Sequence, residues 1–196
     1  MTLPNQLTIL RIFLSPVFLF LFLQDEPLLK QISLIVFIIA ALSDWYDGWL
    51  ARKFNYITEW GKFMDPLADK FLTSVGFLGL VFVGLLELWM VIIIIIRDFS
   101  VTLLRIYADK KEFAFVTSYY AKWKTMLQMT FLYYLLILYV ADVTLYLGEK
   151  HKDLFDILLN KYLVYYVMLL ITFITLHTGY VYVRKNISLI KKIFTR

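Results

Sequence analysis

The sequence predicts an all-α fold, an integral membrane bundle of six transmembrane helices with both termini in the cytoplasm. Composition and the grouping of apolar residues predict it. Hydrophobic residues make up 61% of the 196 residues and charged residues only 18%, against about 45–50% and about 25% in soluble domains. The apolar residues are gathered into long runs. This composition excludes a disordered chain and argues against a soluble domain.

Six stretches are long enough to cross a bilayer, because a membrane-spanning helix needs about 20 mostly apolar residues. In chain order they are about 7–23, 31–51, 61–85, 88–106, 123–147 and 160–183. They fill most of the chain, so residues 1–196 are expected to form a single transmembrane domain.

The residues inside and between these stretches support each helix in turn. The first has Arg11 within its apolar run and no small-residue cleavage site after it, which argues against a signal peptide. The second and third are joined by a short polar connection, 52–60, and the fourth contains five successive isoleucines at 92–96. Between the fifth and sixth, charges mixed with apolar residues at 148–161 predict a short surface helix.

Basic residues are unevenly distributed over the connections. Thirteen Lys and Arg lie in or beside 52–60, 105–122 and 184–196, and four lie in the opposite connections. Since Lys and Arg favour the cytoplasmic side, we expect the 52–60 connection and both termini there, in a multi-pass protein of the cell membrane. The net charge of +5 then belongs to this membrane face and does not indicate nucleic-acid binding.

Four aspartates lie on either side of the 52–60 connection. Asp44 and Asp47 are three residues apart and share one face of a helix, as do Asp65 and Asp69, which are four apart. A connection this short makes the two helices antiparallel neighbours. Both pairs of carboxylates are therefore predicted to converge near the cytoplasmic boundary, where the active site would face the cytoplasm.

Bound divalent cations would stabilise four carboxylates held this close to the membrane. All-oxygen ligation suits Mg²⁺ or Mn²⁺. Gly48 and Ala51 continue the stripe of the first pair and leave room for a ligand, while Gly61 lies one turn before Asp65. The alternative is that the acids are solvated and form ion pairs with basic neighbours, namely Arg52, Lys62 and Lys70.

The stretch from Asp44 to Asp69 resembles the signature of the CDP-alcohol phosphatidyltransferases, with all eight signature positions and their spacings kept. This resemblance implies six transmembrane helices, a homodimer, and transfer of a phosphatidyl or related group from a CDP-linked donor to an alcohol, with release of CMP. It also implies a role for each residue. Metal would be held by Asp44, Asp47 and Asp65. Asp69 would be the general base and also a metal contact. The CDP site would include Gly48, Ala51, Arg52 and Gly61.

The first residues resemble the N-terminal pattern of bacterial phosphatidylglycerophosphate synthases within that family. Asn5, Thr8 and Arg11 lie roughly on one helix face and offer a polar surface with a cation. We assign Asn5 and Thr8 to the CDP-donor site and Arg11 to the acceptor phosphate. The alternative is that Asn5 caps the helix and Arg11 reaches the lipid headgroups.

Two later segments supply further cations. Arg97 and Arg105 are about two turns apart on one helix, and Lys122 and Lys124 follow in the next. Such a group would bind the phosphate of a phosphorylated acceptor, although positive-inside anchoring is the alternative. The synthases usually have Glu where this chain has Asp98, and Gly where it has Ala121.

Together these features predict transfer of the phosphatidyl group from CDP-diacylglycerol to glycerol 3-phosphate, giving phosphatidylglycerophosphate. A carboxylate base and metal ions suffice for this chemistry, and the chain has no Cys nucleophile. The nearest alternative is a cardiolipin synthase that uses phosphatidylglycerol as acceptor. An alternative of another class is a divalent-cation transporter, which predicts acids near mid-membrane and inverted repeats.

Overall fold

The computed structural model describes residues 3–54, 58–111, 113, 119–144 and 151–194, with the side chains of 51, 52 and 191–194 outside the description. Regular structure in these ranges is α-helical. The helices are α1 (Leu3–Phe22), α2 (Pro27–Phe54), α3 (Glu59–Phe82), α4 (Leu88–Lys110), α5 (Tyr119–Thr144), α7 (Lys152–Leu158) and α8 (Lys161–Phe194).

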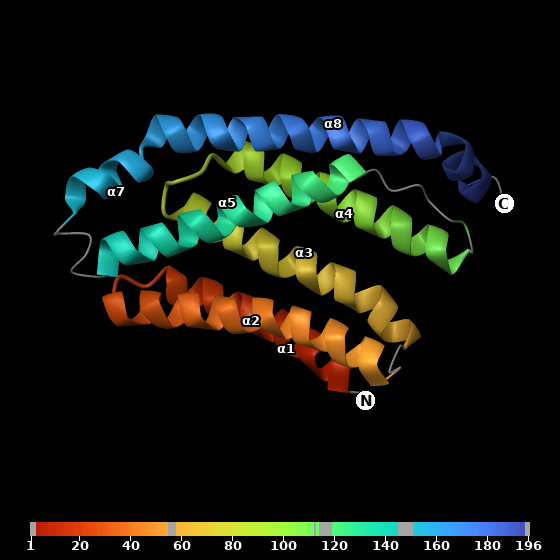
Figure 1. The fold of residues 1–196 in the computed structure, drawn as a ribbon, viewed down its shortest axis with the longest axis horizontal. Helices are drawn as coiled ribbons and strands as arrows, with labels where there is room; N and C mark the ends of the chain where they lie inside the picture. Colours follow the sequence, from red (N-terminus) through yellow and green to blue (C-terminus); the bar gives the residue numbers. More distant parts are fainter. Residues whose placement is uncertain (1–2, 55–57, 112, 114–118, 145–150, 195–196) are drawn as a thin grey trace.

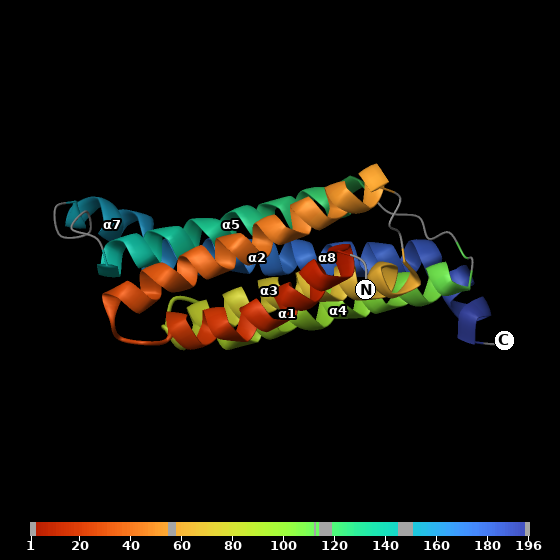
Figure 2. The ribbon, with the colours of Figure 1, turned by 90° about the horizontal axis from the view of Figure 1, so that it is seen from below.

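The six long helices correspond to the six predicted stretches, and the short α7 is the surface helix predicted between the last two. They run lengthwise in one elongated bundle (Figures 1 and 2). α8 lies along one long side, α1 and α2 along the other, and α3, α4 and α5 lie between them (Figure 1). α1 begins and α8 ends toward the same end of the bundle, and α7 lies at the opposite end.

Four segments in the described ranges are long and apolar enough to cross a membrane. These are Leu3–Phe22, Pro27–Leu50, Tyr119–Thr144 and Lys152–Ile190. α3 and α4 have similar lengths, 24 and 23 residues, but carry several charged residues. Four of these charges, Asp65, Asp69, Arg97 and Arg105, belong to the predicted site and lower the hydropathy of the two helices.

Large apolar side chains cover much of the outer surface. Phe13, Phe20, Ile96 and Phe173 are all more than half exposed on the isolated chain. A soluble protein rarely presents so much apolar surface, whereas lipid tails solvate it. The fold is thus that of a multi-pass membrane protein.

α3 packs in the middle of the bundle because small residues let its neighbours come close. A Cβ at Gly76 would lie 3.0 Å from the Phe37 ring, and one at Gly79 would lie 3.1 Å from the Phe22 ring. Those rings pack with Phe18, with centroids 4.8 Å (Phe37) and 5.3 Å (Phe22) away. This core fixes α3 against α1 and α2, and so fixes the acidic residues near its first turns.

Candidate functional site

Arg11 of α1 joins the two aspartates of α2. Its side chain is 0% exposed, and its Nη1 donates to Asp44 Oδ1 at 2.5 Å while its Nη2 donates to Asp47 Oδ2 at 2.6 Å. The Asp44 side chain is 46% exposed and that of Asp47 only 5%. The buried guanidinium therefore neutralises one buried and one half-exposed carboxylate, and Arg11 does not reach out to lipid headgroups.

The same face of α1 also contacts α3. Thr8 donates to Asp65 Oδ1 at 2.5 Å, and Asn5 Oδ1 accepts a hydrogen bond from Thr58 at 3.0 Å. Thr58 caps α3 through the backbone N–H of Gly61. A Cβ at Gly61 would lie 3.1 Å from Asn5 Oδ1, so glycine permits this close approach. Asn5 lies within α1 and is not its N-cap.

The four aspartates occupy one region, as the sequence predicted. The Asp44 carboxylate is repelled by those of Asp65 and Asp69, and the Asp47 carboxylate by that of Asp65. No three acids or histidines among the described residues form a compact metal-binding group. Arg11 and Thr8 occupy carboxylate oxygens here. The donor set nevertheless fits a hard divalent cation, because the four carboxylates supply the oxygen ligands that such an ion prefers.

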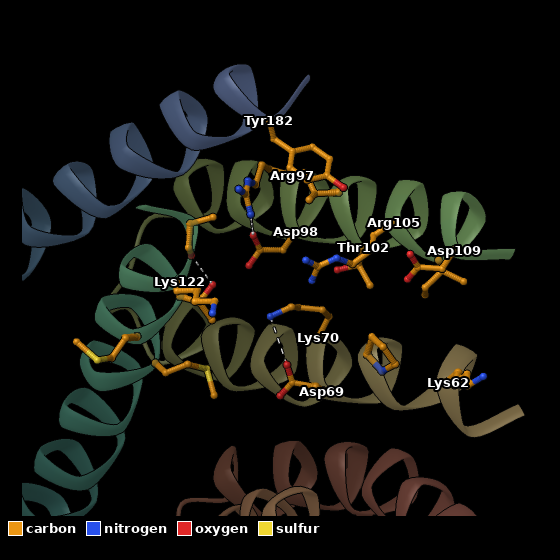
Figure 3. A pocket seen from close by; sticks show the side chains of 17 residues that line it. Lys62, Asp69, Lys70, Arg97, Asp98, Thr102, Arg105, Asp109, Lys122 and Tyr182 are labelled. Carbon is orange, nitrogen blue, oxygen red and sulfur yellow. Dashed lines mark hydrogen bonds and ion pairs between the residues drawn. The ribbon is translucent and has the colours of Figure 1, made fainter. Parts of the chain in front are cut away.

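A cavity of about 530 Å³ opens beside this cluster, between α3, α4 and α5 (Figure 3). Asp69 lies on its wall, and Asp69 Oδ2 forms an ion pair with Lys70 Nζ at 3.3 Å. The other polar lining residues come from all three helices and from α8. They are Lys62, Arg97, Asp98, Thr102, Arg105, Asp109, Lys122, Thr125 and Tyr182.

Three of the basic residues predicted to bind an acceptor phosphate line this cavity, namely Arg97, Arg105 and Lys122. The other two, Arg11 and Lys124, are absent from its lining. Arg11 is engaged by α2 as described above. Lys124 is 2% exposed, and its Nζ lies 2.6 Å from Asp98 Oδ1. Of the five basic residues predicted to bind the acceptor phosphate, three thus line the cavity. The other two pair with aspartates instead: Arg11 with Asp44 and Asp47, and Lys124 with Asp98.

Several cavity residues escaped the sequence assignments. Lys70 and Asp109 have no special spacing, and Tyr182 comes from a helix without a recognised motif. Asp98 was noted as a departure from Glu and as a charge within a membrane span, and was given no role in the site.

The alternative of ion pairing within the acidic stretch holds in part. Lys70 does pair with Asp69, but Lys62 pairs with Glu59 at 2.8 Å on the surface. The side chains of Ala51 and Arg52, both predicted for the CDP site, lie outside the described residues. Gly48 directly follows the buried Asp47 on α2.

Residues 1–174 match the family model for CDP-alcohol phosphatidyltransferase. Similar curated proteins are named CDP-diacylglycerol--glycerol-3-phosphate 3-phosphatidyltransferase. The one from Rickettsia bellii (strain RML369-C) is 32% identical over 180 residues, 92% of each chain. The one from Bacillus subtilis (strain 168) is 46% identical over 116 residues, which are 53% of this chain and 60% of that protein. The family model spans most of the chain, and the signature aspartates lie together in the fold. The chain therefore belongs to the CDP-alcohol phosphatidyltransferase family.

Proposed function

We propose that this chain transfers the phosphatidyl group of CDP-diacylglycerol to glycerol 3-phosphate, forming phosphatidylglycerophosphate and releasing CMP. The observation that supports this most is the juxtaposition of Asp69 with a cavity lined by Arg97, Arg105 and Lys122. A phosphorylated acceptor would place its phosphate on these cations and its hydroxyl near the carboxylate. Relatives that align with 92% of this chain bear the name of this activity.

Asp69 would act as general base. The acceptor hydroxyl oxygen forms a bond to the β-phosphorus of the donor, and the bond from that phosphorus to the oxygen bridging to CMP breaks. CMP leaves with the bonding electrons, and the hydroxyl proton passes to Asp69. The side chain is 31% exposed and lines the cavity, so it is accessible to an acceptor. Lys70, its ion-pair partner, would hold it in place.

Asp44, Asp47, Asp65 and Asp69 would hold Mg²⁺ or Mn²⁺. Such ions neutralise a diphosphate and stabilise the departing CMP. We expect turnover to be lost in excess EDTA and restored by Mg²⁺ or Mn²⁺. Activity that persists in EDTA after exhaustive dialysis would refute the metal requirement.

The donor would lie over the first turns of α1 and α3 and the last turns of α2. Asn5 lies against Gly61 there, Thr8 donates to Asp65, and Gly48, Ala51 and Arg52 follow on α2. We place this site on the cytoplasmic side of the cell membrane, because the charge asymmetry favours that orientation. The homodimer that the family resemblance implies stays a prediction.

Cardiolipin synthesis is not favoured, because the similar proteins reported above are named for glycerol 3-phosphate. A cation transporter is not favoured either, because the acids lie toward one end of the bundle and the chain belongs to a transferase family. An acceptor screen tests these readings directly. Purified protein with CDP-diacylglycerol and Mg²⁺ should release CMP with glycerol 3-phosphate and yield phosphatidylglycerophosphate by mass spectrometry. Product only with phosphatidylglycerol would reassign the acceptor.

Arg105→Ala tests the acceptor pocket. Loss of one charge-assisted hydrogen bond to phosphate, about 1.5–3 kcal/mol, should raise the KM for glycerol 3-phosphate about 10- to 150-fold. Donor affinity should change little. Arg184→Ala is the matched control, because Arg184 is exposed on α8 and outside the cavity lining. An unchanged KM in Arg105→Ala would make Arg105 a topology anchor.

A further inference from the structure

Asp98 is a buried hub on the cavity wall. It is 5% exposed. Its Oδ1 accepts from Arg97 Nη1 at 2.9 Å and from Lys124 Nζ at 2.6 Å, and its Oδ2 accepts from Gln128 Nε2 at 3.3 Å. The Asp98 carboxylate thus joins α4 to α5 through Lys124 and Gln128, and it also pairs with its neighbour Arg97 on α4 (Figure 3).

Arg97 is held from a second side by α8. Its Nη2 donates to Thr178 Oγ1 at 3.1 Å. Its stem lies against Gly179, where a Cβ would come within 3.1 Å of Arg97 Cγ. Arg97 lines the cavity, so Asp98, Thr178 and the missing side chain of Gly179 together fix how its guanidinium is presented.

Lys124 is in a different position from Arg97. It is 2% exposed, it is absent from the cavity lining, and its ammonium is directed at Asp98. A phosphate in the cavity would therefore meet Arg97 and not Lys124. Because Asp98 is shared between two cations, it does not fully neutralise Arg97, and the wall of the cavity keeps a positive charge.

We propose that Asp98 and Lys124 are a positioning pair that orients Arg97 and preserves its charge for the acceptor phosphate. This inference rests on the proposed function, and it revises the expectation that Lys124 itself binds phosphate. Removing Lys124 would leave Arg97 as the one cation on Asp98, beside the neutral amide of Gln128, and would weaken the binding of an anion by Arg97. Removing the charge of Asp98 would release Arg97 and leave Lys124 buried without its partner.

A double-mutant cycle on the KM for glycerol 3-phosphate tests the pair. Asp98→Asn and Lys124→Met should each raise this KM about tenfold or more, the scale of one charge-assisted hydrogen bond. Both should leave kcat and the apparent KM for CDP-diacylglycerol within about threefold. Because the two residues act as one unit, the double variant should lie within about threefold of the worse single variant.

If Lys124 contacts phosphate directly, the two effects multiply to about 100-fold in the double variant, and that result would overturn the inference. Unchanged KM values in both single variants would overturn it as well. Asp156→Asn, an exposed change on α7, is the control for introducing the amide. Wild-type turnover with glycerol 3-phosphate is measured first, and its absence refutes the proposed function rather than the pair.

Thr178→Val provides a second test in case Asp98→Asn does not fold, as judged by size exclusion in detergent. It removes only the hydroxyl that accepts from Arg97 and keeps the side-chain shape. We expect a several-fold higher KM for glycerol 3-phosphate at constant kcat. A wild-type KM in Thr178→Val would show that Arg97 needs no positioning, and the inference would fail.

Discussion

The buried Arg11 pairs with two carboxylates, those of Asp44 and Asp47, that would otherwise repel each other. Arg11→Ala should therefore lower the thermal unfolding temperature in detergent. Breaking a buried ion pair costs about 3–5 kcal/mol, and the lower end applies because nearly half of the Asp44 side chain is exposed. Added Mg²⁺ should recover more stability in Arg11→Ala than in wild type, because a cation can replace the lost charge.

Arg184→Ala again provides the matched control, since it removes an exposed arginine. If Arg11→Ala melts like wild type, the contacts of Arg11 with Asp44 and Asp47 contribute nothing to folding. If Mg²⁺ stabilises both proteins equally, the idea that a cation and Arg11 compensate the same acids is wrong.

Asp69 belongs to a different class of residue, because it faces the cavity and not the packed interior of the cluster. Asp69→Asn should lower kcat about 10²- to 10⁴-fold, the usual contribution of a general base. CDP-diacylglycerol binding, followed by equilibrium dialysis with labelled donor, should be largely kept. Asp142→Asn is the control, because it makes the same change near the C-terminal end of α5, outside the cavity lining. Near-wild-type turnover in Asp69→Asn would remove its assignment as base.

Single residues differ in how far the sequence could predict their surroundings. The spacing of Asp44, Asp47, Asp65 and Asp69 is local and was enough to predict that they share one region. The partners of Arg11 and Lys124 depend on which helices pack together, and helical periodicity does not contain that information. The sequence therefore led us to group both cations with the residues that bind the acceptor phosphate, whereas in the structure both form ion pairs with aspartates.

At the scale of elements, α3 is the helix on which the site depends, because it carries Asp65 and Asp69 at one end and packs in the core at the other. Gly76→Val should lower thermal stability. Its Cβ alone would stand 3.0 Å from Phe37 and 3.2 Å from Leu132, and overpacking typically costs about 1–3 kcal/mol.

Ser100→Val is the control, since it places the same side chain at an exposed position of α4. Thermal unfolding of both variants in the same detergent makes the comparison. Equal stability of Gly76→Val and wild type would mean that α3 can shift away from Phe37 without cost, contrary to the close packing described.

Helix positions were largely predictable, because each long apolar run must satisfy its backbone internally within a membrane. The ends differ by a few residues in most cases, and α8 extends to Phe194, well past the predicted 183. Helical periodicity in the sequence did not predict where α1 packs. It contacts both α2 and α3, so Arg11 and Thr8 bridge the two acidic pairs, where direct contact between α2 and α3 alone was expected.

The whole molecule concentrates its chemistry at one end. The acidic cluster and the basic cavity are carried by the last turns of α2, the first turns of α3, the second half of α4 and the start of α5, which all lie toward that end of the bundle (Figure 1). The opposite end has α7 and the turn at Gly84, whose φ of +80° favours glycine. This polarity is consistent with the 13-to-4 division of basic residues in the sequence.

The orientation of this polarity in the membrane can be measured cleanly, because the chain has no Cys. Lys110→Cys and His151→Cys place single thiols at exposed positions toward opposite ends of the bundle. In intact cells, a membrane-impermeant maleimide should label His151→Cys and should label Lys110→Cys only after permeabilisation. The physical reason is the retention of Lys and Arg on the cytoplasmic side. The reverse pattern would place the active site outside the cell, away from the cytoplasmic pool of phosphorylated acceptors. That result would contradict the proposed function.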